Sequence, residues 1–287
     1  MADVASENRY AAWIGRQEIL TDTVEPGAVR RLLATLDDVD ARLGPGDPLP
    51  PLWHWLAFLP EAPQSVLGPD GHPAAADFRP PIDLPRRMFA GAQFRFHSPI
   101  PIGAPLRRVG TVADVREKNG RTGRLVFMTV RYQVFHGERL CVEEEVSSVH
   151  RDLGPPMAEP AAGGELPVLP AGAWSRTIVP DPVFLFRFSA LTFNGHRIHY
   201  DRPYATGVEG YAGLLVHGPL VAVLLIDLVR RHAPRRTVRS YQFRASAPIF
   251  DTAPFRVIGV PAADGSVALT AERADGIAAM TGQVQFA

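Results

Sequence analysis

The sequence predicts an α+β chain in which one unit, a helix wrapped by an antiparallel sheet, occurs twice. Residues 93–110 (QFRFHSPIPIGAPLRRVG) and 242–259 (QFRASAPIFDTAPFRVIG) align without a gap at an offset of 149, with nine identities in eighteen positions. Strand-like stretches follow each copy, and an apolar helix-like stretch precedes each set. Such a repeat indicates a duplicated unit of about 140 residues, a normal domain size.

The elements of both copies are predicted from composition and turn signals. Stretches rich in Val, Phe, Thr and Tyr, separated by turns such as NGRTG and HGE, predict strands. These strands are expected over 106–117, 124–135, 139–150, 238–244, 255–260, 266–273 and 277–286. Helices over 52–59 and 219–231 are apolar nearly all round and should be buried inside the strands that follow them. Two leading helices are expected, over about 8–18 and 26–36.

The chain divides into two halves joined by a linker. Residues 154–172 are rich in proline and glycine and poor in charge, which is typical of a linker. The N-terminal half is therefore expected over 1–153, with a long polar loop at 60–85, and the C-terminal half over 173–287.

Composition narrows the function classes. Thirty basic and thirty acidic side chains give no net charge, so neither nucleic acid nor an anionic membrane is expected as a partner. The single cysteine, Cys141, excludes an intrachain disulfide and is expected to be a structural thiol. The N-terminus does not read as a signal peptide, and the most apolar segment, 221–229, is far shorter than the roughly 20 residues that span a bilayer. A cytoplasmic protein is expected.

Three of the nine histidines, His196, His199 and His217, cluster in the segments FNGHRIH and LLVHGP. Imidazole titrates near neutral pH, so such a cluster is the first place to look for chemistry. A metal site is not expected, because the HExxH pattern and thiolate ligands are missing. Serine-hydrolase GxSxG and glycine-rich nucleotide loops are also absent from the sequence. His72, in a turn, is expected to be solvated.

The stretch FSALTFNGHRIHYDRPYA (188–205), followed by GLLVHGPL (213–220), resembles the signature of the MaoC-like (R)-specific hydratases. It is most similar to the branch that contains mitochondrial 3-hydroxyacyl-thioester dehydratase type 2 and the bacterial mesaconyl-C4-CoA and itaconyl-CoA hydratases. PLPPLWHWLAFLP and the QFRF strand resemble the degenerate N-terminal half of that branch. The resemblance covers nearly the whole chain. It implies a double hot-dog fold, an acyl-CoA substrate and no cofactor beyond the CoA of that substrate.

The wider family carries the pattern Gly-Asp-x-Asn-Pro-x-His, in which the Asp and His hold and activate a water molecule. The resemblance places Asn194 on the Asp and His199 on the His, while His196 and Arg197 take the place of Asn-Pro. A carboxamide cannot take up a proton as a carboxylate can. The resembled branch shares this departure, so the residue at Asn194 is interpreted as a sign of a variant mechanism and not of an inactive enzyme.

Adding water to an enoyl thioester requires three groups. His199 is the expected base, and Asn194 can fix the water because its amide both donates and accepts hydrogen bonds. The backbone N–H of Gly218, at the start of an apolar helix, is suited to a developing enolate oxygen. The resemblance points to the same glycine.

Several roles have structural alternatives. His199 could instead be a core histidine and Asn194 a turn or cap residue. His196 either positions water or packs, and His217 is expected to orient the turn before the helix. Asp201 either orients His199 or begins the loop that follows.

The ends of the ligand are assigned by charge and position. Arginine matches phosphates and carboxylates bidentately, which favours Arg197, Arg202 and Arg244 near the motif or the equivalent strand, with Arg86 and Arg87 as further options. His54 is expected to line the acyl tunnel in the N-terminal half, with Trp53 and Trp55 either lining it or packing in the core.

These observations together favour a hydratase/dehydratase of a 2-enoyl or 3-hydroxyacyl thioester, with a short dicarboxylic acyl-CoA such as mesaconyl-C4-CoA or itaconyl-CoA as substrate. The alternatives are a dehydratase of the fatty-acid type and a non-catalytic acyl-CoA-binding subunit. Assembly into a homo-oligomer is left open.

Overall fold

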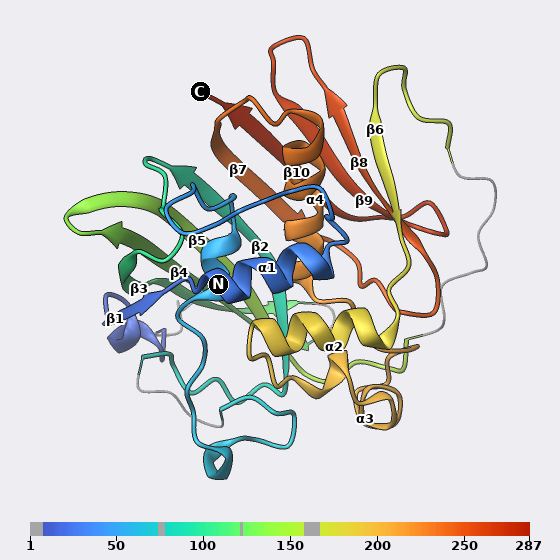
Figure 1. Cartoon of the computed structure of the whole chain (residues 1–287). Helices are drawn as coiled ribbons and strands as arrows, with labels where there is room; N and C mark the ends of the chain where they lie inside the picture. The colour runs from blue at the N-terminus through green and yellow to red at the C-terminus, as the bar shows by residue number, and fades with distance from the viewer. Residues whose placement is uncertain (1–7, 74–77, 121–122, 158–166) are drawn as a thin grey trace, which may run out of the picture.

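The computed structural model describes residues 8–73, 78–120, 123–157 and 167–287. Its strands form one ten-stranded antiparallel sheet in the order β1-β3-β4-β5-β2-β7-β10-β9-β8-β6 (Figure 1). The N-terminal strands are β1 (Gln17–Thr23), β2 (Arg86–Phe96), β3 (Pro105–Gly120), β4 (Gly123–His136) and β5 (Arg139–Arg151). The C-terminal strands are β6 (Trp174–Ile178), β7 (Val238–Ala245), β8 (Phe255–Pro261), β9 (Val267–Arg273) and β10 (Ala278–Phe286). The seven strand ranges predicted from composition are therefore confirmed.

The two copies of the internal repeat meet at one strand pair, β2 and β7, which we call the seam. Strands β2 and β7, which begin the two repeat copies, pair antiparallel, and Gln93 lies opposite Gln242. These two residues are also aligned with each other in the repeat. The halves are thus related by an approximate twofold axis through this pair, and what sequence analysis described as two sheets is one continuous sheet.

Each half begins with the same pair of elements. In the N-terminal half, β1 leads into α1 (Pro26–Thr35), and in the C-terminal half β6 leads into α2 (Pro182–Leu191). The two edge strands take equivalent places at the ends of the sheet, β1 on β3 and β6 on β8. Helices α1 and α2 pack against each other near the middle of the molecule (Figure 1).

The apolar helix predicted in the C-terminal half is α4 (Gly218–His232). Every residue from Leu220 to Val229 is buried, because the helix crosses the concave face of β7 to β10 (Figure 1). Three basic residues in its last turn, Arg230, Arg231 and His232, suit the negative end of the helix dipole. No helix among the described residues is long and apolar enough to cross a membrane.

The helix predicted over 52–59 is wrong: the structure has one 3₁₀ turn, η2 (Trp53–Leu56). Leu52 and Phe58 have left-handed backbone angles on either side of this turn, with φ of 70° and 57°. Prolines at 50, 51 and 60 restrict the flanking backbone and prevent a longer helix. The described residues of the N-terminal half therefore place no long helix in its concave face.

Two other elements differ from the sequence-based prediction. The expected helix at 8–18 is one short 3₁₀ turn, η1 (Ala11–Trp13), followed by the mostly exposed edge strand β1. The second leading helix is confirmed as α1. Helix α2 was not predicted, since its run of Val and Phe is typical of strands, although Asp181 followed by Pro182 is an N-terminal helix signal.

The halves meet between β5, which ends at Arg151, and β6, which begins at Trp174. The boundaries predicted at 153 and 173 fall in this interval, and residues 158–166 of the predicted linker lie outside the described residues. Cys141 is fully buried on β5, and this burial raises the pKa of its thiol, as suits a structural cysteine.

Candidate active site

His199 lies at the end of a short turn, η4 (Arg197–His199), between α2 and α3 (Arg202–Gly207). Its Nδ1 is 2.7 Å from the carbonyl oxygen of Leu215. A carbonyl can only accept a hydrogen bond, so Nδ1 carries the proton and Nε2 keeps the lone pair. Burial, followed by the positive charge that neighbouring His196 would carry, lowers the pKa of His199 to about 3. The ring is therefore neutral and able to accept a proton at pH 7.

His217 holds the His199 ring from the other side. The two rings stack with centroids 3.7 Å apart, and Nε2 of His217 lies 2.8 Å from the Ser189 hydroxyl of α2. Burial lowers the pKa of His217 well below its usual value, so this ring is also neutral. His217 is the N-cap residue of α4, in keeping with its expected place before the helix, and it also packs on the His199 ring.

Gly218 is the first residue of α4, and His217 provides no side-chain cap for the N–H groups there. The first N–H groups of a helix have no intrahelical acceptor and lie at the positive end of its dipole. A Cβ on Gly218 would come within 2.8 Å of the Phe89 ring, which closes this side of the site. The helix start can thus present a donor to an oxygen atom of a bound ligand.

Asn194 lies just after α2 and is half-buried. Its Oδ1 accepts a hydrogen bond of 3.0 Å from the backbone N–H of His196, so the amide oxygen takes part in a local turn. The turn alternative from sequence analysis is thus present in the structure, and the side chain still lines the same cavity as His196 and His199.

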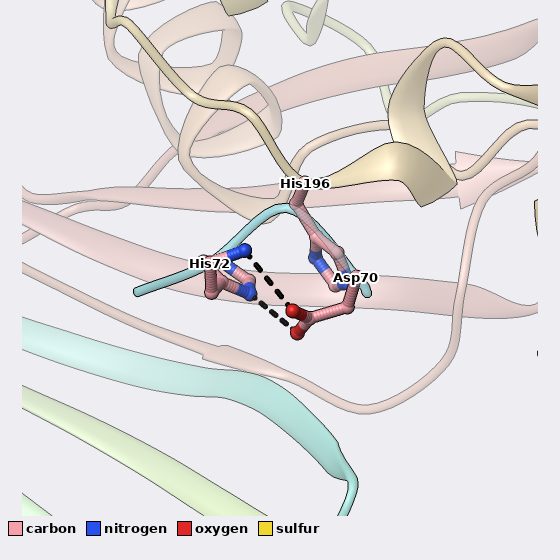
Figure 2. A group of neighbouring side chains, drawn as sticks. All are labelled: Asp70, His72 and His196. Carbon is pink, nitrogen blue, oxygen red and sulfur yellow. Dashed lines mark hydrogen bonds and ion pairs between the residues drawn. The ribbon is translucent and has the colours of Figure 1, made fainter. Parts of the chain in front are cut away.

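His196 faces a loop of the N-terminal half. Its ring centroid is 5.5 Å from that of His199 and 4.2 Å from that of His72. His72 Nδ1 is 2.9 Å from Asp70, which also accepts the His72 backbone N–H (Figure 2). Burial, followed by His72, lowers the pKa of His196 to about 3. Burial alone would raise the pKa of Asp70, but the hydrogen bonds from His72 outweigh it and lower the pKa to about 2.

Asp70 and His72 are the residues at the site that sequence analysis missed. His72 was expected to be a solvated turn residue; its side chain is 29% exposed, and the loop that carries it is docked on the motif. Gly71, with φ of +89°, lies so close to Gly195 that a Cβ would come within 2.0 Å of the Gly195 carbonyl oxygen. The sequence GPDGHP, inside the long 60–85 loop, places an aspartate and a histidine close together and could have drawn attention to them. Nothing in that sequence indicates where the loop docks.

One ligand atom from each of Asp70, His72 and His196 lies within 4.8 Å of the others, a spacing that could hold a metal ion. This set differs from the three histidines weighed from sequence. The Asp70 carboxylate already accepts a hydrogen bond from His72. The group is therefore explained equally well by hydrogen bonding as by a metal ion.

A single cavity of about 1740 Å³ connects these groups with the interior of the N-terminal half. Both halves line it. Asn194, His196, His199 and Gly218 come from the C-terminal half, and Trp55, Arg87, Phe89, Tyr132 and Ser148 come from the N-terminal half. The space left by the missing N-terminal helix thus opens onto the histidine cluster.

Asp201 does not contact His199. It caps α3 by accepting the Tyr204 N–H at 3.1 Å and pairs with Arg197 at 2.7 Å. Of the two alternatives left open, the structure supports the one in which Asp201 begins the following segment. Arg197 also donates to the Pro69 carbonyl at 2.9 Å, so it holds the 68–72 loop in place.

The other residues that were expected to bind the ligand differ in whether they line the cavity. Arg244 is exposed and lines the cavity. Arg202 pairs with the buried Asp251 and does not line the cavity. His54 as a tunnel residue is wrong: it is 3% exposed, bonded to Glu144 and outside the cavity lining. Trp53 packs in the core, whereas Trp55 reaches the cavity wall.

Comparison with known proteins identifies the family of this chain. The family model described as hydroxyacyl-thioester dehydratase type 2 matches residues 52–251. The mesaconyl-C(4)-CoA hydratase of Chloroflexus aurantiacus is 51% identical over 277 residues, which covers 96% of this chain and 98% of that protein. The mitochondrial hydroxyacyl-thioester dehydratase type 2 of Schizosaccharomyces pombe is 25% identical, over 83% of this chain and 88% of that protein.

Solved structures show the same fold at low sequence identity. A MaoC-like dehydratase matches with a TM-score of 0.69 at 17% identity, over 96% of this chain and 99% of that chain. A Mycobacterium tuberculosis protein described as having a double hot-dog fold matches with a TM-score of 0.61 at 15% identity, over 95% of this chain and 96% of that chain. The predicted double hot-dog is confirmed, and the chain belongs to the hydroxyacyl-thioester dehydratase type 2 family of hydro-lyases.

Proposed function

We propose that this enzyme reversibly adds water to the 2-enoyl thioester of a short dicarboxylic acyl-CoA, with mesaconyl-C4-CoA as the leading substrate. The observation that carries the proposal is the 51% identity, over nearly both full lengths, to a mesaconyl-C(4)-CoA hydratase. The site supports it, because a neutral histidine base and a free helix N-terminus meet in one cavity.

The chemistry follows from three groups. His199 takes a proton from water through Nε2 while the water oxygen bonds to the β-carbon of the substrate. The electron pair of the double bond moves to the thioester oxygen, and the N–H of Gly218 stabilises the resulting enolate. The proton then passes to the α-carbon, which restores the thioester and the neutral site. Asn194 holds the water by hydrogen bonding, because its amide cannot itself take up the proton.

Arg87 is our proposed partner for the substrate carboxylate. In mesaconyl-C4-CoA the free carboxylate is attached to the β-carbon, so its partner must lie near the histidine cluster. Arg87 lines the cavity and acts electrostatically on His196. Arg87 is exposed on β2, where the like charge of Arg79 acts on it. A bound carboxylate would offset this repulsion, and guanidinium is the cation that pairs with carboxylates bidentately.

Arg244 is our proposed contact for the phosphate end of CoA. It is exposed at the cavity on β7, next to the seam, and is free to move towards a ligand. Arg197 and Arg202 are occupied by Asp201 and Asp251, so we assign them to holding the motif and not to binding CoA.

The test is to supply the purified chain with mesaconyl-C4-CoA, crotonyl-CoA and a long-chain 2-enoyl-CoA and follow loss of the conjugated absorbance. We expect turnover of mesaconyl-C4-CoA to exceed that of the others in kcat/KM. Faster turnover of the long-chain substrate would replace the proposal with a dehydratase of the fatty-acid type. Binding of all three without turnover of any would identify a non-catalytic acyl-CoA-binding subunit.

We further propose that the enzyme acts in the cytoplasm and needs no cofactor apart from the CoA of its substrate. Its assembly into homo-oligomers stays a prediction that sedimentation can test.

A further inference from the structure

In the signature that this sequence resembles, a carboxylate stands where this chain has Asn194, whose carboxamide cannot take up a proton. The structure brings another carboxylate, that of Asp70, close to the motif from the N-terminal half. Asp70 lies on the 68–72 loop, more than 120 residues from Asn194 in sequence, and its partner His72 lies against His196. This loop is locked to the motif at two backbone contacts: Arg197 N–H donates to the Asp70 carbonyl at 2.9 Å, and Gly71 abuts Gly195.

Three features make the Asp70–His72 pair suited to acid–base work. His72 Nδ1 lies 2.9 Å from Asp70, so Nδ1 carries a proton and Nε2 is the basic nitrogen. His72 is among the residues that line the cavity, whereas Asp70 is not. The Asp70 carboxylate contacts the ring and the backbone N–H of His72 (Figure 2). A carboxylate that holds an imidazole in one tautomer and stabilises its cation is the arrangement found behind catalytic histidines in general.

We propose that His72, held by Asp70, is a second acid–base group of the hydration site and takes over the task of the carboxylate missing at Asn194. This inference rests on the proposed hydration. Within it, Asp70 is a positioning residue, because it acts through His72.

The reaction moves one proton from the water molecule to the α-carbon of the substrate. The water O–H bond breaks as its oxygen bonds to the β-carbon, and the electron pair of the double bond moves to the thioester oxygen. His199 Nε2 takes the released proton, but burial disfavours its cation. The proton therefore passes to Nε2 of His72, whose Nδ1 is held by Asp70, and from there it bonds to the α-carbon. The His196 ring is in contact with both of the other rings.

The test is an exchange of carboxylates. We expect Asp70→Asn, which keeps the shape of the side chain, to lower kcat for mesaconyl-C4-CoA by about 10²-fold with little change in KM. Adding Asn194→Asp to that variant should restore at least about tenfold, because a general base or acid contributes 10²–10⁴-fold wherever it is placed correctly. If Asp70 only holds the loop, the second change restores nothing, and the inference is overturned.

A matched control is Asp264→Asn. Asp264 accepts the N–H of Ser266 two residues ahead, at 2.9 Å, as Asp70 does with His72, but it lies in a hairpin away from the cavity. This control should leave kcat unchanged. Circular dichroism and CoA binding report whether each variant folds, and His72→Gln provides a second way to remove the dyad, with the same expected loss.

The pH profile gives an independent readout. The groups that face the dyad are His196 and His199 from the motif, Arg87 from β2, Arg79, and His150 from β5. If the dyad handles a proton of the reaction, Asp70→Asn should change the shape of kcat/KM against pH, whereas a residue that only holds the loop would leave that shape unchanged. An unchanged profile together with unchanged kcat would refute the dyad.

Two other outcomes are distinguishable. If the unmodified chain hydrates no enoyl-CoA, the proposed function fails before the dyad is tested. If activity is lost with EDTA and restored by Zn²⁺, the Asp70, His72 and His196 group is a metal site, and the acid–base assignment is wrong.

Discussion

The two halves of the sheet share one topology but fill their concave faces differently. In the C-terminal half, α4 occupies the concave face, and ten consecutive residues of it, Leu220 to Val229, are buried. In the N-terminal half, as far as the structure describes it, the corresponding place holds the 3₁₀ turn η2 next to the cavity. Polar groups lie on the N-terminal strands there, including Ser148 Oγ and His150 Nε2, which are buried without a hydrogen-bond partner among the described residues.

The difference shows how a duplicated fold can divide its tasks. Apolar burial against α4 supplies stability to the C-terminal half and fixes the start of the helix where Gly218 and His217 lie. The N-terminal half gives up a helix, which leaves room for a ligand and brings the 68–72 loop onto the motif. One active site results, with walls from both halves.

The largest expected effect is the loss of the base on the C-terminal side. His199→Ala should lower kcat/KM by about 10²–10⁴-fold, because general base catalysis contributes that much. His232→Ala is the control, since His232 stacks on Trp174 at the far end of α4. Steady-state kinetics on the enoyl-CoA that is turned over fastest measures both, and undiminished turnover in His199→Ala would show that the base lies elsewhere.

The contrast between the two concave faces predicts unequal stability effects. Leu224→Ala, in the packed face, should lower the free energy of unfolding by about 2–5 kcal/mol, as large-to-small core substitutions do. Ser148→Ala, in the cavity face, should change it by less than about 1 kcal/mol, because its buried hydroxyl has no partner to lose. Urea unfolding measures both. Equal losses would mean that the N-terminal face is as tightly packed as the C-terminal face.

The charge in the N-terminal cavity should set substrate selectivity. Arg87→Leu should reduce kcat/KM for mesaconyl-C4-CoA by about tenfold to 10²-fold relative to crotonyl-CoA, because only the first carries a carboxylate to pair. Arg95→Leu is a matched control on the same strand, since its side chain is 75% exposed and pairs with Glu143. A parallel fall for both substrates would assign Arg87 to folding or to CoA binding.

The smallest effects concern pH. The folded protein lowers the pKa of His196 and His199 to about 3 and of His150 to about 4, whereas unfolded histidine titrates near 6.5. Below pH ~6.5 the unfolded chain therefore binds more protons, and the free energy of unfolding falls as pH falls, by up to about 1.4 kcal/mol per pH unit for each such histidine. Above that pH these groups add no slope.

Substitutions can assign the pH dependence of the free energy of unfolding to individual histidines. His199→Gln in the C-terminal half should reduce its slope against pH by up to about 1.4 kcal/mol per pH unit between pH ~6.5 and ~4. His150→Gln should cause a similar reduction in the N-terminal half. Urea unfolding at four pH values measures the slopes. A variant that kept the full slope would show that its histidine is already protonated in the folded protein.

Local patterns were sufficient for much of the fold. The seven strands were predicted because alternation and turn chemistry act over a few residues, and α4 because its apolar run is long enough to be a buried helix. Other elements depend on partners distant in sequence. The segment Gln17–Thr23 is a strand because β3 pairs with it. By contrast, 52–59 is no helix for a local reason, because left-handed residues interrupt it and prolines flank it.

The sequence by itself determined the duplication, the double hot-dog fold and the placing of Asn194, His199 and Gly218 in one motif, since these depend on contiguous residues. Only the tertiary structure decided that His54 is sealed behind Glu144, that Arg197 and Arg202 serve as structural pairs, and that Asp70 and His72 meet His196. The physical reason is that side-chain contacts across the two halves depend on how a long loop docks. That docking is set by close backbone approaches, such as Gly71 on Gly195, which leave no periodic trace in the sequence.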